Sequence, residues 1–360
     1  MPTSDSDTIS DMPRIKPPPN LPQLVKTAFN KARESGDLIY YPTEVTLLNV
    51  NSIPVCASPS NPPAALPIQT YRLQFQLRFS PSLANKPKAP PPSSTPGKKQ
   101  PFNPFANPSA SLLISPLPPS HNLVLNKFAV VPEHFILSTK EFAKQTDLLG
   151  EQDLEAAHAC IRAYAGEGRE LFVFFNSGEH SGASQPHRHL QMLDVGNMRE
   201  GLPEENGWEV LADGLAGGER QGRKVPFWTA GRRVEKGWSG RELWRCYLEL
   251  YRRACRKMGV EVEGQSDGEA RISYNLAMTR GAMVICPRVS EGGSVRGEGG
   301  EEVGWLALNG TVLAGTALVK SRREWDALRR DPRQVAEVLE RIGVTAGEEA
   351  ERSDEEDVSG

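Results

Sequence analysis

The sequence predicts an α+β fold built on an antiparallel sheet, and three observations lead to this class. Short, mostly apolar segments bounded by Gly, Ser, Asn or Pro are typical of strands. Other segments carry apolar side chains at the spacing of one helix face. The two kinds of segment do not alternate as they do in a doubly wound sheet, and tight or glycine-rich loops join the central strands.

The elements can be assigned in chain order. We predict strands over 122–131, 171–175, 187–193, 282–286 and 316–319. A helix is predicted over 151–165, and apolar side chains recur at helical spacing through 240–258 and 323–343.

Polar and low-complexity stretches divide the chain. Residues 1–20 are proline-rich and predict a disordered tail, while 57–67 and 86–101 predict surface excursions. The glycine-glutamate stretch 290–304 and the acidic tail 347–360 have the same character. The largely polar segment 195–210 marks a boundary between a domain over 21–200 and a second over 201–346.

Composition narrows the class of protein. The 42 basic and 45 acidic residues leave a net charge of −3, so there is no general basic field for nucleic acid and any grip on phosphate must be local. The five cysteines form no C-x-x-C pair, which favours reduced thiols and a cytoplasmic or nuclear compartment. No secretory signal and no membrane-spanning stretch are expected.

The segment 171–193 carries the chemistry. Two apolar strands flank a polar loop over 176–186. On a strand, alternate side chains share a face, so His187, His189 and Gln191 lie together, roughly 6.5–7 Å apart between neighbours. That spacing is about the span of a phosphate with its contacts.

Three side chains on this face have distinct predicted roles. A neutral imidazole attacks phosphorus well at pH ~7, because its ordinary pKa is about 6.5, and His189 in the middle is best placed to attack. His187 and Gln191 would hydrogen-bond the phosphate oxygens and leaving group. An amide at position 191 can orient the leaving group but cannot shuttle a proton to it. Gln191 therefore favours transfer over simple hydrolysis, with a covalent intermediate that waits for an acceptor.

The loop before the histidines offers further donors. Gly178 and Gly182 let the backbone approach a ligand closely. The polar side chains there can contribute donors to a phosphate-binding nest; they are Asn176, Ser177, Ser181, Ser184 and Gln185.

Other interpretations of these residues remain open. The H-x-H spacing also suits a zinc site completed by His180, Glu179 or His134. The loop could be a plain hairpin turn, and the histidines could have no role. Three of the six histidines fall within ten residues of one loop, which favours a functional site.

At this point the sequence resembles the fungal-type diadenosine tetraphosphate phosphorylases (ATP adenylyltransferases), a histidine-triad branch whose motif ends in Gln. NSGEHSGASQPHRHLQ carries the central match. Further landmarks occur in family order and cover most of 70–345; they are SLANKP at 82–87, FNPF at 102–105, 121–145, YNLAMTRGAMVICPR at 274–288 and LNGTVLAGTALVK at 308–320.

The resemblance implies a histidine-triad-like sheet with flanking helices and two related halves that share one cleft. It implies that His189 forms an adenylyl-histidine and that the other residues of the motif bind nucleotide. The implied substrate-binding residues are Asn126, Lys127, Asn176, Ser177, Gly182, Ala183, Ser184, Gln185, Asn309, Gly310, Thr311, Thr316 and Lys320, with His187 and Gln191 assisting catalysis.

The implied reaction is diadenosine tetraphosphate plus phosphate giving ATP plus ADP. Mg²⁺ would accompany the polyphosphate without a metal site in the protein. The expected partners are therefore diadenosine polyphosphates, ATP, ADP and phosphate, on a monomer or homodimer. Two features depart from the family pattern: Thr316 replaces a bulkier methionine-like residue, and 45–56 lacks an expected substrate-binding lysine.

Rival functions are a hexose-1-phosphate nucleotidylyltransferase, a dinucleoside polyphosphate hydrolase and a non-catalytic nucleotide-binding regulator. The sequence shows no evident Cys/His zinc cluster, which weighs against the first. The combination of nucleophile, loop and Gln191 weighs against the last.

Overall fold

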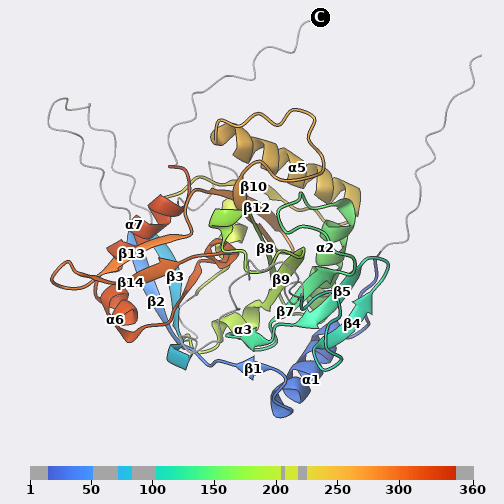
Figure 1. The fold of residues 1–360 in the computed structure, drawn as a ribbon, viewed down its shortest axis with the longest axis horizontal. Coiled ribbons are helices and arrows are strands. Elements are labelled where there is room, and N and C mark those ends of the chain that lie inside the picture. The colour runs from blue at the N-terminus through green and yellow to red at the C-terminus, as the bar shows by residue number, and fades with distance from the viewer. Residues whose placement is uncertain (1–14, 52–71, 83–102, 204–206, 218–224, 346–360) are drawn as a thin grey trace, which may run out of the picture.

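The structure is a computed structural model that describes residues 15–51, 72–82, 103–203, 207–217 and 225–345 (Figure 1). The stretches predicted as excursions at 57–67 and 86–101 and as an acidic tail at 347–360 lie outside these residues. Within the predicted tail over 1–20, residues 15–20 are described. Ile15 is buried there, and its backbone N–H donates to Glu155 Oε1 at 3.1 Å.

An eight-stranded sheet forms the centre of the molecule. Its strands lie in the order β10 (Ala230–Arg233), β12 (Ala282–Arg288), β11 (Ser273–Met278), β8 (Leu171–Ser177), β9 (His189–Asp194), β7 (Phe135–Thr139), β5 (His121–Leu125) and β4 (Leu113–Leu117). Every neighbouring pair is antiparallel, which confirms the predicted α+β class. Because β8 pairs with β11, the sheet runs without a break across the predicted boundary near residue 200.

Helices α1 (Leu21–Glu34), α2 (Glu151–Gly166) and α5 (Gly240–Lys257) cover one face of this sheet (Figure 1). The helices predicted over 151–165 and 240–258 are confirmed. A capping box begins α5: Ser239 Oγ accepts from the Glu242 N–H at 3.3 Å, and the Glu242 carboxylate accepts from the Ser239 N–H at 2.6 Å. Leu190 and Met192 of β9 point into this helical core.

The opposite face carries a second hydrophobic core and the remaining elements of the fold. A three-stranded sheet lies here, in which β3 (Arg72–Phe79) pairs parallel with β15 (Thr316–Val319) and antiparallel with β2 (Glu44–Asn51). The other elements on this side are α3 (Val195–Arg199), α4 (Leu211–Leu215), the hairpin β13 (Gly292–Arg296) and β14 (Glu302–Ala307), the 3-10 turn η4 (Gly310–Ala314), α6 (Arg322–Arg330) and α7 (Arg333–Ile342).

Two minor elements complete the fold. Strand β1 (Ile39–Tyr40) pairs parallel with β6 (Phe128–Ala129), and the 3-10 turn η2 (Glu179–Ser181) follows β8. No helix of the described part of the chain is long and apolar enough to cross a bilayer.

The single strand predicted over 122–131 is wrong, because the chain turns after β5. The Asn126 side chain accepts a hydrogen bond from the Phe128 N–H at 3.0 Å, an Asx turn that competes with the sheet ladder. The strand therefore resumes only as β6, beside β1.

The single helix predicted over 323–343 is also wrong, because Pro332 divides it into α6 and α7. Proline offers no N–H and forces the residue before it out of helical geometry. Asp331 accordingly has φ −128° and ψ 85°.

The prediction of a surface excursion over 290–304 is wrong as well, since β13 and β14 form a hairpin there. Its apolar residues Val295 and Leu306 are fully buried. A Cβ on Gly293 would lie 3.1 Å from Val338, so this glycine lets the hairpin pack tightly on α7.

The turn η4 docks on the central sheet through a residue without a side chain. A Cβ on Gly310 would lie 2.7 Å from Phe174 Cδ2 and 2.8 Å from Asn176 Oδ1. We expect Gly310→Ala to lower the free energy of unfolding by about 1–3 kcal/mol through overpacking, measured by urea denaturation. Gly281→Ala is the control, because a Cβ at that position would meet no atom within 4 Å; equal losses in both variants would contradict the docking.

Candidate active site

His189 begins β9 and points away from the helical core. Its Nδ1 lies 2.8 Å from the carbonyl of His187. A carbonyl only accepts, so Nδ1 carries the proton and the lone pair of the neutral ring lies on Nε2. The His189 N–H donates to Gln145 Oε1 at 2.8 Å, which fixes the backbone as well.

The ring of His189 is kept neutral by its surroundings. It is 4% exposed and lies against the ring of Phe105, with centroids 5.0 Å apart. Burial lowers the pKa of His189 to about 4, because the charged imidazolium would lose its hydration. At neutral pH the site therefore presents an unprotonated Nε2.

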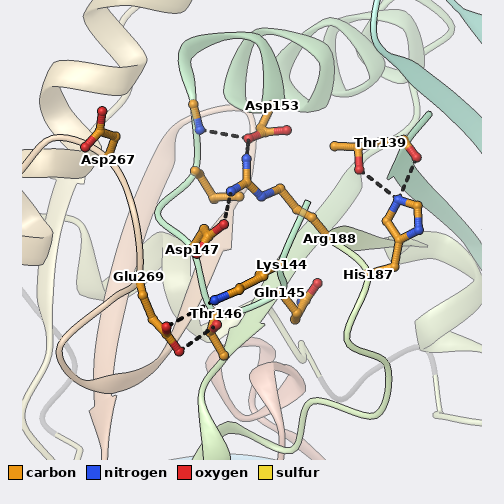
Figure 2. A network of polar contacts seen from close by, with 12 residues as sticks. Thr139, Lys144, Gln145, Thr146, Asp147, Asp153, His187, Arg188, Asp267 and Glu269 are labelled. Carbon is orange, nitrogen blue, oxygen red and sulfur yellow. Dashed lines mark hydrogen bonds and ion pairs between the residues drawn. The ribbon is translucent and has the colours of Figure 1, made fainter. Parts of the chain in front are cut away.

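His187 supports His189, and its own ring is held by hydrogen bonds to the protein. Its Nε2 donates to the Thr139 carbonyl at 2.9 Å (Figure 2). This tautomer leaves Nδ1 to accept from Asn103 Nδ2 at 2.8 Å. Both ring nitrogens are thus engaged with protein, so in this arrangement neither is left for the phosphate contact predicted from the sequence.

Arg188 points to the helical face and anchors the same segment from behind. Figure 2 shows its guanidinium between Asp153 and Asp147, at 3.0 Å from Asp153 Oδ2 and 3.9 Å from Asp147 Oδ2. Asp153 also accepts from His121 Nε2 at 2.8 Å. Burial alone would raise the pKa of Asp153, but the hydrogen bond from His121 and the charge of Arg188 hold it below its ordinary value.

Gln145 joins the two strands that carry the motif, and sequence reasoning did not single it out. Its Nε2 donates to the Asn176 carbonyl at 2.8 Å and to the His189 carbonyl at 3.2 Å. It follows β7 within the 121–145 landmark, but its role requires a long-range contact that spacing cannot show. Asn103 and Phe105 were likewise flagged only as part of the FNPF landmark.

The predicted alternation along β9 is confirmed. Gln191 lies on the same face as His189, in register with Phe174 of β8 and Ile136 of β7, and is partly exposed. Leu193 follows on that face and enters the second core.

Asn176 ties the two halves of the chain together beneath the site. Its Oδ1 accepts from Asn275 Nδ2 at 2.9 Å and from the Gly310 N–H at 2.8 Å. Asn275 in turn accepts from Arg288, a buried arginine. The amide oxygen predicted to contact nucleotide is therefore occupied by the protein.

The glycine-serine loop packs closely against the second half of the chain. Gly182 has φ 77°, and a Cβ there would lie 2.7 Å from Asn309 Cβ. Ser177 is fully buried on the other face of β8, beside Tyr274, so its hydroxyl does not lie on the face of the sheet that carries His189.

The tip of the loop retains free backbone donors. Ala183 and Gln185 are partly exposed and Ser184 is exposed. Among the described residues, the backbone N–H groups of these three form no hydrogen bond. They are available to phosphate oxygens at the end of the loop that leads to His189.

The substrate-binding residues predicted in the second half lie in η4 and β15 or directly beside them. Asn309 accepts from the Thr311 N–H at 3.0 Å and begins η4. Thr311 Oγ1 donates to the Thr316 carbonyl at 3.3 Å, and Thr316 Oγ1 donates to Gln76 Oε1 at 2.9 Å. Lys320 is exposed, and its ammonium has no ion pair among the described residues.

Asn126 and Lys127 directly follow the end of β5, and β7 lies between that strand and β9 with His189. Asn126 Nδ2 contacts the His134 ring at 3.2 Å, and Lys127 is exposed. The described residues contain no group of three His, Cys, Asp or Glu side chains arranged to hold a metal ion, so the zinc interpretation gains no support there.

Comparisons with known proteins find two family models and several similar proteins. A model of the Ap4A (diadenosine tetraphosphate) phosphorylase N-terminal domain matches residues 64–206, and one of the ATP adenylyltransferase C-terminal domain matches 223–345. Diadenosine 5′,5′′′-P1,P4-tetraphosphate phosphorylase 2 of Saccharomyces cerevisiae is 30% identical over 297 residues, covering 76% of this chain and 86% of that protein. Protein APA1 of the same yeast is 25% identical over 338 residues, covering 91% and 95%.

A solved structure is similar over nearly the whole chain. The crystal structure of yeast Ap4A phosphorylase Apa2 in complex with Ap4A aligns with a TM-score of 0.69 and 26% identity, covering 91% of this chain and 98% of that one. A second crystal structure of that enzyme, in complex with AMP, aligns with the same TM-score of 0.69.

The anchor behind the site predicts a large loss of stability when it is broken. Arg188→Met would leave the buried carboxylate of Asp153 without its cation, and we expect the free energy of unfolding to fall by about 3–5 kcal/mol, measured by chemical denaturation. Lys144→Met removes the neighbouring pair with Glu269, in which both side chains are 60% exposed, and should cost less than about 1 kcal/mol. Similar losses in the two variants would show that Arg188 is not an anchor.

Proposed function

The chain belongs to the Ap4A phosphorylase family of nucleotidyltransferases, and we propose that it cleaves diadenosine tetraphosphate with phosphate through an adenylyl group carried on His189. One observation carries the proposal. Nε2 of His189 is unprotonated, and Nδ1 is fixed on the His187 carbonyl. The loop that precedes the motif has three backbone N–H groups, those of Ala183, Ser184 and Gln185, that form no hydrogen bond within the described part of the chain. This arrangement suits in-line attack on phosphorus better than proton transfer.

In the first half-reaction, Nε2 of His189 forms a bond to the α-phosphorus as the bond to the bridging oxygen breaks, and ATP leaves. The ring gains positive charge as this bond forms. The Nδ1–H bond to the His187 carbonyl stabilises that charge without removing the proton. Backbone N–H groups of Ala183 to Gln185 would hold the non-bridging oxygens.

In the second half-reaction, an oxygen of phosphate attacks the same phosphorus, the bond to Nε2 breaks and ADP leaves. His189 returns to its neutral form without a net proton change at the ring. Gln191 holds and orients the groups on the face of β9 but cannot activate water as a base, so the adenylyl group waits for the anionic acceptor.

We propose that Mg²⁺ enters with the polyphosphate, where it would neutralise phosphate charge. The phosphate oxygens of the substrate would supply its main ligands. We also propose a cytoplasmic location that extends to the nucleus. The four described cysteines are free and buried, as suits a reducing compartment.

The covalent step can be observed directly. Incubation of the protein with diadenosine tetraphosphate in the absence of phosphate should give a protein mass increased by one AMP, and His189→Ala should give none. Addition of phosphate should discharge the adduct as ADP, read by chromatography. ATP plus AMP formed without phosphate would instead indicate a hydrolase, and turnover of UDP-glucose would indicate a sugar-nucleotide transferase.

The lowered pKa of His189 predicts an unusual pH profile for the adduct. Because this pKa is about 4, the nucleophile stays unprotonated and the rate of adduct formation should change little between pH 7 and pH 5. A histidine with an ordinary pKa of about 6.5 would be mostly protonated at pH 5 and lose most of its rate. The rate of adduct formation is measured at each pH by single-turnover quench experiments after a brief pH jump.

The lowered pKa of His189 also makes the free energy of unfolding depend on pH, so the rate measurements need a control for folding. The folded pKa lies below the unfolded value, so the stabilising contribution is complete above pH ~6.5 and is lost as pH falls toward 4. Circular dichroism at each pH must show that the protein is still folded. A rate that falls tenfold or more between pH 7 and pH 5 in folded protein would contradict the buried neutral nucleophile.

A further inference from the structure

A cavity of about 560 Å³ opens at one edge of the central sheet, where β8 begins and β9 ends. Helix α2, the turn 279–281 between β11 and β12, and residues 234–237 after β10 form its walls. The end of β9 at Asp194 lies roughly 17 Å from His189 by strand geometry. The reaction proposed above therefore does not use this cavity, although its volume suits a small-molecule ligand.

Backbone hydrogen bonds hold the walls of the cavity in place. The Val234 N–H donates to the Gly281 carbonyl at 3.0 Å, which joins the segment after β10 to the turn between β11 and β12. The Val195 N–H donates to the Glu170 carbonyl at 2.9 Å, which joins the end of β9 to the start of β8. The cavity is thus formed by regular structure in the fold.

His158 of α2 lines the cavity and is the polar group that its structural surroundings leave unsatisfied. It is 5% exposed, and its ring forms no hydrogen bond or ion pair among the described residues. Burial, with a smaller effect of the nearby charge of Arg162, lowers the pKa of His158 to about 4. The neutral ring therefore offers one donor and one acceptor, and a buried polar group without partners is costly unless a ligand or water satisfies it.

Three cations surround the mouth of the cavity. Arg162 lies one turn after His158 on α2, Lys236 follows β10, and Arg280 lies in the turn between β11 and β12. All three are exposed, and within the described part of the chain none of them forms an ion pair. A fourth lining cation, Arg169, is already paired with two carboxylates outside the lining.

The carboxylates of the lining are fewer and partly engaged. Glu170 pairs with Arg199 at 3.6 Å, and Asp213 accepts a hydrogen bond from Thr279. Glu235 is exposed, so solvent screens its charge. The mouth therefore favours an anionic group near the three unpaired cations.

We propose that this cavity is a second ligand site, which binds a nucleoside monophosphate. The phosphate would lie among the three cations, and one edge of the base would bond the donor and acceptor of His158. The base would pack on the apolar residues of the lining, which are Ile161, Leu171, Val195, Val210 and Val234. A fatty carboxylate could use the cations but would leave His158 unsatisfied, which favours the nucleotide.

Binding of AMP to the full-length protein tests the assignment. The catalytic site can bind AMP as well, so the two sites are separated by number and by place. Titration calorimetry of the unmodified protein should give two AMP per chain. Photolabelling with 2-azido-AMP, followed by peptide mapping, should place one of the two labels on residues that line the cavity, and excess AMP should prevent it.

Variants separate the contact to the base from the contact to the phosphate. His158→Phe keeps a ring but removes both hydrogen-bonding atoms, and should abolish the cavity label; His158→Gln restores a donor and an acceptor and should retain it. Arg162→Met should weaken AMP binding to the cavity roughly 10- to 100-fold, the scale of one charge-assisted hydrogen bond, and adenosine binding less than about threefold. Arg256→Met is the matched control, because this exposed arginine of α5 does not line the cavity.

Several outcomes would overturn the assignment. One AMP per chain with every label on the loop 176–186, or equal affinities in Arg162→Met and Arg256→Met, would show that the cavity holds no nucleotide. Displacement of the label by palmitate and not by AMP would assign the cavity to a carboxylate. If His158→Phe does not fold, Arg162→Met decides alone, because Arg162 is exposed. The AMP adduct on His189 is scored separately, so this assignment and the proposed function can fail independently.

Discussion

The hydrogen bond from Nδ1 of His189 to the carbonyl of His187 decides which atom of this site can react, and most of the surrounding structure maintains it. The bond requires the backbone at the start of β9 to keep one extended geometry. Three anchors hold that geometry from different directions: Thr139 and Asn103 on the His187 ring, Gln145 on the His189 backbone and Asp153 on Arg188. Because side chains alternate between the two faces of the sheet, His189 can react on one face while Arg188 anchors the same segment on the other.

The fold class followed from the sequence because strand and helix periodicities were clear and did not alternate. Errors occurred where a local side chain overrode the periodicity. Asn126 turned the chain within an apolar run, and Pro332 divided an amphipathic run whose helical spacing continued on both sides. Both signals were present in the sequence. The β13–β14 hairpin was harder to predict, because its strands are rich in Gly and Glu and only tertiary packing on α7 identifies them.

The site was predictable in its nucleophile and in the face that carries it, because a strand motif fixes which side chains share a side. The sequence could not show which polar groups form hydrogen bonds within the protein itself. The ring of His187 and the amide oxygen of Asn176 have the chemistry of ligand-binding groups, yet both bond to residues distant in the chain. Long-range pairing decides such cases, and one sequence does not contain it.

The parallel pairing of β15 with β3 joins residues 316–319 to residues 76–79. When the ribosome has made the first three hundred residues, β3 therefore still lacks one of its two neighbours, and one edge of that strand is unprotected. Contacts of such sequence separation slow folding, because a long loop must close before they form. The three-stranded sheet can be completed only after residues 316–319 have been synthesised. During translation this edge of β3 therefore stays unpaired until β15 has been made. A chaperone that shields such edges would act at that stage.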